Sequence, residues 1–202
     1  MTQKTVTAPL ADRVAFFRAQ SAAITFTMAR DAVVYLLSNN ISSNNPIHDP
    51  LVTAALILYA RPFQQKQPLR LSPDILKGEH RSFHDFLMTC RNKFAAHTDL
   101  DGPITDSGWL VNELAGRTKD GLTIFGITIV VPDLKLILAH LELVQPMVET
   151  EARSIWAKYF KGVRVPNGVS IVNLEEGIAP FLIPHPNSDS GAIPPIALPL
   201  SS

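Results

Sequence analysis

The chain has 202 residues, of which 46% are hydrophobic and 18% are charged, and its 18 basic residues balance its 18 acidic ones. A chain of this length and composition can bury a core of its own, which argues against intrinsic disorder, while the balanced charge argues against a general polyanion binder. Its single cysteine excludes an internal disulfide and a thiolate metal cluster.

The first part of the chain predicts two helices separated by a polar break. Residues 10–39 contain no proline or glycine, and apolar residues recur at helical spacing, which predicts a long first helix. A run rich in serine and asparagine, residues 38–46, should interrupt it, because short polar side chains compete for backbone hydrogen bonds. Asp49 and Pro50 form an N-cap and first-turn pair that predicts a second helix, and Pro62 should end or bend that helix.

The middle of the chain predicts a connector, a third helix and a β-hairpin. Ser72 and Pro73 predict a short helical turn within the connector. A third helix is expected to begin near Glu79 and to pack through one apolar stripe. Segments on either side of a turn at residues 119–121 predict a β-hairpin at about residues 109–131, because the second segment is rich in β-branched residues. The stripe of the third helix consists of Phe83, Phe86, Leu87, Cys90 and Phe94.

The last part of the chain predicts one more helix and a proline-rich tail. The helix should run from Leu134 to about Phe160, with a kink at Pro146. Seven of the sixteen prolines lie beyond it, so residues 162–202 are predicted to form an extended tail with one strand around residues 169–172. Its apolar residues suggest that it lies along another surface, such as that of a second subunit. Residues 1–161 would then form a helical domain.

The segment that most suggests chemistry is R-N-K-F-A-A-H-T-D, which begins at Arg91 near the end of the predicted third helix. Arg91 is permanently charged and can bind a phosphate through its planar fork of donors, whereas His97 exchanges a proton near neutral pH. Together they match metal-independent cleavage of RNA, in which proton transfer activates the 2′-hydroxyl and a cation stabilises the charge on phosphorus. Asn92 is expected to bind the phosphate or orient the imidazole, while Lys93 and Asp99 tune its pKa.

The spacing of this motif also predicts an oligomer. At about 100° per residue, Arg91 and His97 lie roughly 240° apart around a continuous helix. They converge only if the helix ends before His97 or if a second protomer supplies its own copy, which a two-fold interface does. The motif therefore predicts a homodimer. His84 shares a helix face with Arg91, so we expect it to support the site or to lie on a dimer surface.

The motif resembles the R-x(4-6)-H signature of HEPN-like domains (higher eukaryotes and prokaryotes nucleotide-binding). Here five residues separate Arg91 from His97, a polar residue, Asn92, follows the arginine, and the histidine lies near a helix end. The segments Y-A-R-P-F, from Tyr59, and H-D-F-L-M, from His84, also resemble uncharacterised bacterial members of this family. The resemblance covers about residues 10–160. It implies a mainly α-helical, HEPN-like antiparallel four-helix bundle, here with a small β-hairpin and an extended proline-rich tail.

The same resemblance implies a metal-independent endoribonuclease that works as a homodimer in toxin-antitoxin, phage-defence or RNA-processing systems. Arg91 and His97 would be the central pair, and Asn92 the supporting polar residue. In toxins paired with a nucleotidyltransferase antitoxin a tyrosine lies two residues after the histidine, and Asp99 stands there instead. From the resemblance as a whole, RNA is the expected substrate, and an antitoxin or regulatory protein is the expected partner.

Other interpretations of these residues remain open. Arg91 would serve structure alone in a salt bridge with Asp85 or Asp99, and His97 would do so as a helix C-terminal cap. His80 lies four residues before His84, a spacing that can hold a metal, which makes a helical metal protein a third hypothesis. No third ligand accompanies these two histidines at a recognisable spacing, so we expect neither a metal nor a cofactor.

The alternative function is a non-catalytic HEPN-like module that binds a protein or a nucleotide. It would use the tail and the stretch from Arg61 to Lys93, which has seven basic residues against three acidic ones. The chain shows no signal peptide and no apolar run of roughly 20 residues, so we expect a cytoplasmic protein without a membrane span.

Overall fold

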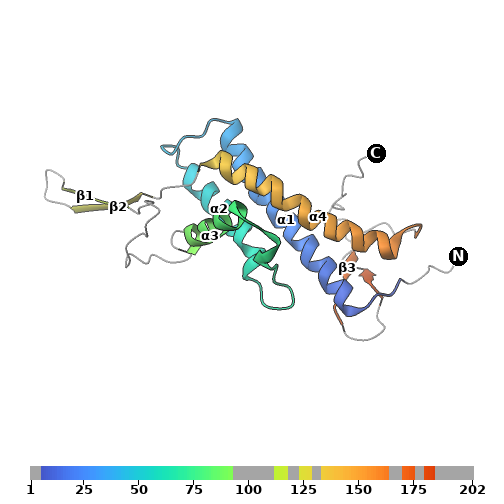
Figure 1. Ribbon diagram of the computed structural model, residues 1–202. Helices are drawn as coiled ribbons and strands as arrows, with labels where there is room; N and C mark the ends of the chain where they lie inside the picture. The colour runs from blue at the N-terminus through green and yellow to red at the C-terminus, as the bar shows by residue number, and fades with distance from the viewer. Residues whose placement is uncertain are drawn as a thin grey trace.

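The computed structural model describes residues 6–92, 112–117, 123–128, 133–163, 170–175 and 180–184. Within these ranges the chain is mainly helical, as the sequence predicts, with small antiparallel strand pairs (Figure 1). None of the helices described there has both the length and the apolar character needed to cross a membrane. The helices are α1 (Leu10–Ser38), α2 (His48–Gln64), the short 3-10 helix η1 (Pro73–Ile75), α3 (Glu79–Cys90) and α4 (Leu134–Phe160).

The two long helices, α1 and α4, lie side by side and run antiparallel (Figure 1). Near the start of α1, Asp12 accepts a hydrogen bond from Lys158, close to the end of α4, over 2.7 Å. Further along α1, Gln145 of α4 donates to the hydroxyl of Thr27 over 3.1 Å. Residue numbers therefore rise along α1 as they fall along α4, which places the end of α1 beside the start of α4.

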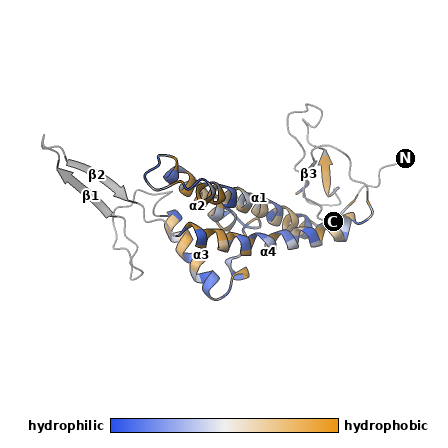
Figure 2. Ribbon diagram, turned by 90° about the horizontal axis from the view of Figure 1, so that it is seen from above, coloured by the Kyte–Doolittle hydropathy of each residue, from blue (hydrophilic) through white to orange (hydrophobic). Residues whose placement is uncertain are grey.

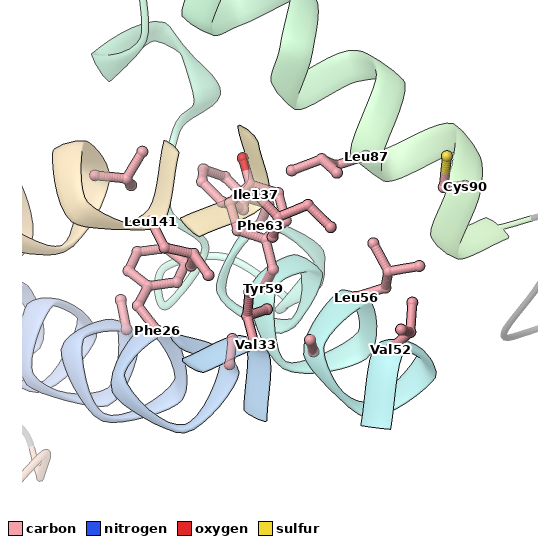
Figure 3. Close-up of a cluster of buried hydrophobic side chains, with 14 of the residues drawn as sticks. Phe26, Val33, Val52, Leu56, Tyr59, Phe63, Leu87, Cys90, Ile137 and Leu141 are labelled. Atoms are coloured by element: carbon pink, nitrogen blue, oxygen red, sulfur yellow. The ribbon is translucent and has the colours of Figure 1, made fainter. Parts of the chain in front are cut away.

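The main hydrophobic core forms where α2 and α3 pack against this helix pair (Figure 3). Phe26 of α1, Tyr59 of α2, Leu87 of α3 and Leu141 of α4 are all fully buried in it. The predicted stripe of α3 is confirmed as far as Cys90: Leu87 and Cys90 are buried, and the two phenylalanines before them are partly buried against the same core. Phe94 lies outside the described residues.

Local sequence signals set several helix boundaries. The Ser72 side chain accepts a hydrogen bond from the backbone N–H of Asp74, which confirms the short helical turn that the sequence predicts there. The Asp133 side chain caps α4 in the same way, by accepting from the backbone N–H of Lys135 over 2.8 Å. Helix α2 continues for two residues past Pro62, so the proline lies inside its last turn.

The predicted β-hairpin is confirmed in its strands. Strand β1 (Asn112–Arg117) pairs antiparallel with β2 (Thr123–Thr128), and Asn112 lies opposite Thr128. The predicted turn at residues 119–121 lies outside the described residues.

The described part of the proline-rich segment packs on helices of its own chain. Strand β3 (Ser170–Val172) confirms the predicted strand and pairs antiparallel with β4 (Leu182–Pro184), which the sequence analysis does not predict. Phe181, fully buried, lies between Phe16 of α1 and Phe160 of α4, at ring-centroid distances of 5.4 and 5.1 Å. β3 lies near the start of α1 in Figures 1 and 2. These contacts form a second, smaller core at this end of the helix pair.

A buried arginine fixes this segment to α1. Arg13 is 0% exposed, and its guanidinium donates to the backbone carbonyls of Asn173 and Glu175, each over 2.8 Å. The N-terminal segment adds backbone hydrogen bonding, since the N–H of Phe181 donates to the carbonyl of Val6. Hydrogen bonds from a charged donor are stronger than those from a neutral one, so Arg13 holds the segment more firmly than a neutral side chain would.

We expect the Phe181→Ala substitution to lower the free energy of unfolding by about 3 kcal/mol or more, because it leaves a cavity among packed aromatic rings. Ile171→Ala, on the half-exposed side of β3, is the matched control and should cost less than about 1 kcal/mol. Urea denaturation of both variants measures the difference. Equal losses would contradict the anchoring role of Phe181.

Candidate functional site

The predicted motif begins where α3 ends. Arg91 and Asn92 continue α3 in a wider, π-type turn directly after Cys90. Lys93, His97 and Asp99 lie outside the described residues. The structure therefore places the two residues that are expected to bind phosphate, while that role and the approach of His97 to Arg91 stay predictions.

A three-residue cluster orients the guanidinium of Arg91. Nη1 of Arg91 donates to the side-chain oxygen of Asn92 over 3.0 Å. Nε2 of Gln64, the last residue of α2, donates to the same oxygen over 3.3 Å. Asn92 thus links Arg91 to the end of α2, and its amide nitrogen has no partner within the described ranges. Asn92 is an exposed residue, so this nitrogen can donate to an anion.

The alternative salt bridge between Arg91 and Asp85 does not form. Nε of Arg81 approaches both carboxylate oxygens of Asp85, at 3.2 and 3.3 Å, and its Nη1 lies 3.2 Å from Asp74. These carboxylates raise the pKa of Arg81 above its usual value, chiefly through the hydrogen bond to Asp85. Arg91 has no carboxylate partner in the described part of the chain. Its Nε is buried without a hydrogen-bond partner there and its Nη1 donates to Asn92, so an anion would be bound through the Nη nitrogens.

Exposed basic residues of α2 and the connector extend the positive charge of this region. The four residues concerned form no salt bridge with any carboxylate that the structure describes. Unpaired positive charge attracts a polyanion over distances of about a Debye length, roughly 8 Å at physiological salt. The four residues are Arg61, Lys66, Arg70 and Lys77.

His84 lies in the core rather than on a surface of the chain. Its side chain is 3% exposed, and its Nδ1 is hydrogen-bonded to the hydroxyl of Tyr59 over 2.7 Å. The same hydroxyl is hydrogen-bonded over 2.9 Å to Nε2 of His140, which is also 3% exposed. The ring of Phe63 packs against His84 at a centroid distance of 4.3 Å. His84 can therefore support the motif only through the position of α3.

This buried network is neutral at physiological pH. Burial, with smaller contributions from the nearby His80 and His84, lowers the pKa of His140 to about 4. Burial also lowers the pKa of His84, and it raises that of Tyr59 above its usual range. At pH 7 the imidazoles of His84 and His140 are therefore neutral, and the phenol of Tyr59 stays protonated.

Three members of these clusters, Gln64, Tyr59 and His140, are not predicted as site residues from the sequence. Gln64 gives no signal, since a glutamine at the end of a helix is common. Tyr59 occurs in the segment that resembles HEPN-like proteins, but nothing in the sequence connects it with His140, which lies 81 residues away. Their juxtaposition depends on how α2 and α4 pack.

His80 remains partly exposed beside this network. Its ring centroid lies 6.0 Å from that of His140. In the described ranges, no three histidine, cysteine, aspartate or glutamate side chains come together in a way that could hold a metal ion. His84, the other residue at metal-binding spacing, uses Nδ1 for Tyr59 instead.

No protein-family model, no curated protein and no solved structure matches this chain. Two clusters of the described residues bear on the function: an arginine oriented by amides at the end of α3, and a buried hydroxyl between two histidines beneath the same helix.

We expect Tyr59→Phe to lower the free energy of unfolding at pH 7 by about 1–3 kcal/mol, because it leaves two buried imidazole nitrogens without a hydrogen-bond partner. Tyr35→Phe is the matched control, since its side chain is 49% exposed and its hydroxyl has no partner among the residues described. Chemical denaturation measures both variants. If the two substitutions have the same small effect, the network does not stabilise the fold.

Proposed function

We propose that this protein is a metal-independent endoribonuclease of HEPN type, with a HEPN-like antiparallel four-helix bundle. The observation that supports the proposal is the state of Arg91: it lies at the end of α3, is oriented by Asn92 and has no carboxylate partner in the described chain. An arginine in this state can bind phosphate through parallel N–H donors.

In this reaction a base removes the proton from an RNA 2′-hydroxyl, and the oxygen attacks the adjacent phosphorus. The bond from phosphorus to the 5′-oxygen then breaks, and an acid protonates the leaving oxygen. His97 serves as the acid or the base, and its counterpart in a second protomer supplies the other role. Arg91 binds the phosphate oxygens as charge develops on them, and Asn92 holds Arg91 in place and donates from its amide nitrogen.

The proposal includes a homodimer, because one copy of the motif supplies one histidine. Exposed basic residues beyond α2, such as Lys66 and Arg70, would contact the RNA backbone on either side of the cleaved bond. A toxin or phage-defence nuclease also needs restraint in its own cell, so an antitoxin or regulatory protein is the partner that we propose.

A non-catalytic HEPN-like module that binds a nucleotide or a protein is the second candidate. The same arrangement of Arg91, Asn92 and Gln64 supports it, since a phosphate held by these donors need not be cleaved. The two functions differ in whether His97 matters, because binding depends on the cation and cleavage also depends on the proton.

We expect purified protein to cleave single-stranded RNA in the presence of a chelator, and His97→Ala to lower the rate by about 10²–10⁴-fold. Arg91→Ala should lower it by about 10²–10³-fold, because the charge on phosphorus loses its cation. His80→Ala and Arg153→Ala are the matched controls, since both side chains are partly or largely exposed and lie outside the cluster.

The cleavage assay separates the two candidates. If His97→Ala cleaves RNA as fast as the wild type, the nuclease proposal fails. If neither protein cleaves any RNA, while Arg91→Ala binds RNA more weakly than Arg153→Ala, the binding module is supported instead.

RNA affinity should fall with salt concentration, and the double substitution Lys66→Ala with Arg70→Ala should make this dependence shallower. For a single strand, each phosphate that the protein no longer neutralises lowers the slope of log K against log salt by about 0.7. Lys135→Ala, at an exposed position at the start of α4, should leave the slope unchanged. Fluorescence anisotropy with a labelled RNA at several salt concentrations measures the slopes. Unchanged slopes in the double variant would exclude the connector from the RNA-binding surface.

A further inference from the structure

One buried hydroxyl joins three helices. The Tyr59 side chain, from α2, is hydrogen-bonded to His84 of α3 and to His140 of α4, and all three side chains are at most 3% exposed. A phenol has one hydrogen to donate and lone pairs to accept with. For both contacts to be hydrogen bonds with neutral rings, Tyr59 must donate to one imidazole and accept from the other.

The second nitrogen of His140 decides which way these bonds run. Its Nδ1 is buried and has no partner within the described ranges. Buried N–H groups without an acceptor are rarer than acceptors without a donor, so we place the ring hydrogen of His140 on Nε2. His140 then donates to Tyr59, and Tyr59 donates to Nδ1 of His84.

Helix α3 depends on this arrangement because it is short and few of its residues are fully buried. Of its twelve residues, three are buried: His84, Leu87 and Cys90. His84 is the only one of the three whose burial requires a polar partner. The hydrogen bond to Tyr59 therefore decides whether this third contact stabilises or destabilises the docking of α3.

We propose that Tyr59 and the two histidines form a proton-sensitive latch: it holds α3 against α2 and α4 while both imidazoles are neutral, and acidification releases α3. When Nδ1 of His84 takes up a proton, it becomes a donor and the Tyr59 hydroxyl loses its acceptor. A positive charge then lies against the ring of Phe63 in the core. Release of α3 hydrates that charge.

The surrounding groups do not cancel this charge. Asp85 of α3 favours a charged His84, but its carboxylate is already paired with Arg81, which opposes that charge. His80, also on α3, and His84 both oppose a charge on His140 of α4. From α2 the titratable neighbour is Tyr59 itself, and from α1 the apolar ring of Phe26 packs against Tyr59.

The sign of the pH effect follows from burial. Burial lowers the pKa of both imidazoles while α3 is docked, so the released form binds protons first. Docking is therefore fully stable above about pH 6.5, the ordinary histidine pKa, and weakens as the pH falls toward 4. Arg91 and Asn92 follow directly after α3, so release also moves this cluster. Any effect of this movement on RNA cleavage rests on the proposed nuclease function.

Hydrogen–deuterium exchange of the full-length protein at pH 7 and pH 5 tests the latch directly. After correction for the intrinsic exchange rate, we expect the protection of Glu79–Cys90 to fall about 25-fold for each histidine that is protonated only in the released form. The middle of α1 should change little. The double variant His84→Gln with His140→Gln should reduce the fall to less than three-fold, whereas His48→Gln, a buried histidine outside the network, should retain it.

The proposal is overturned if α3 loses no more protection than α1, or if the folded double variant shows the full loss. Should that variant fail to fold, NMR titration of the wild-type imidazoles gives the answer. Titration of both histidines above pH 6 in the native protein would overturn the latch. Neither measurement uses RNA, so a failure of the latch and a failure of the nuclease proposal can be told apart.

Discussion

The antiparallel pair of α1 and α4 is the constraint on which the rest of the structure depends. Two helices of 29 and 27 residues cannot bury their apolar faces against each other alone, so each half of the pair needs a cover. Helices α2 and α3 cover the half that contains Phe26 and Leu141, while β3 and β4 cover the half that contains Phe16 and Phe160. The other elements thus pack on the helix pair in two places, and each place has its own hydrophobic core.

This arrangement explains why the polar clusters occur where they do. The hydroxyl of Tyr59 lies where α2, α3 and α4 meet, a place that side chains from only two helices would not fill. Arg91 and Asn92 lie just beyond that meeting point, at the end of the shortest α-helix that the structure describes. The position of Arg91 therefore depends on the packing around His84, two helical turns earlier in α3. The proposed site near the surface is thus supported by a hydrogen bond in the core.

Local patterns in the sequence predict the helices, because apolar periodicity and the cap at Ser72 act over a few residues. The N-cap predicted at Asp49 is wrong, since α2 begins at His48 without a side-chain cap and Asp49 lies in its first turn. Local patterns also predict β1, β2 and β3. They do not predict β4, the burial of Arg13 or the contact between Tyr59 and His140, since each depends on segments far apart in the chain. For the candidate site, the sequence identifies Arg91 and Asn92 but not Gln64. Long-range packing brings that amide to Asn92, and no local pattern encodes it.

The buried guanidinium of Arg13 has a consequence for where this protein can be cut. A boundary after residue 161 looks natural from composition, because the helices end there and the prolines follow. A shortened chain would leave Arg13 without the carbonyls of Asn173 and Glu175, and it would expose the rings of Phe16 and Phe160 that Phe181 covers. Such a fragment would self-associate through the uncovered end. That artefact would be easy to mistake for the homodimer that we propose from the motif.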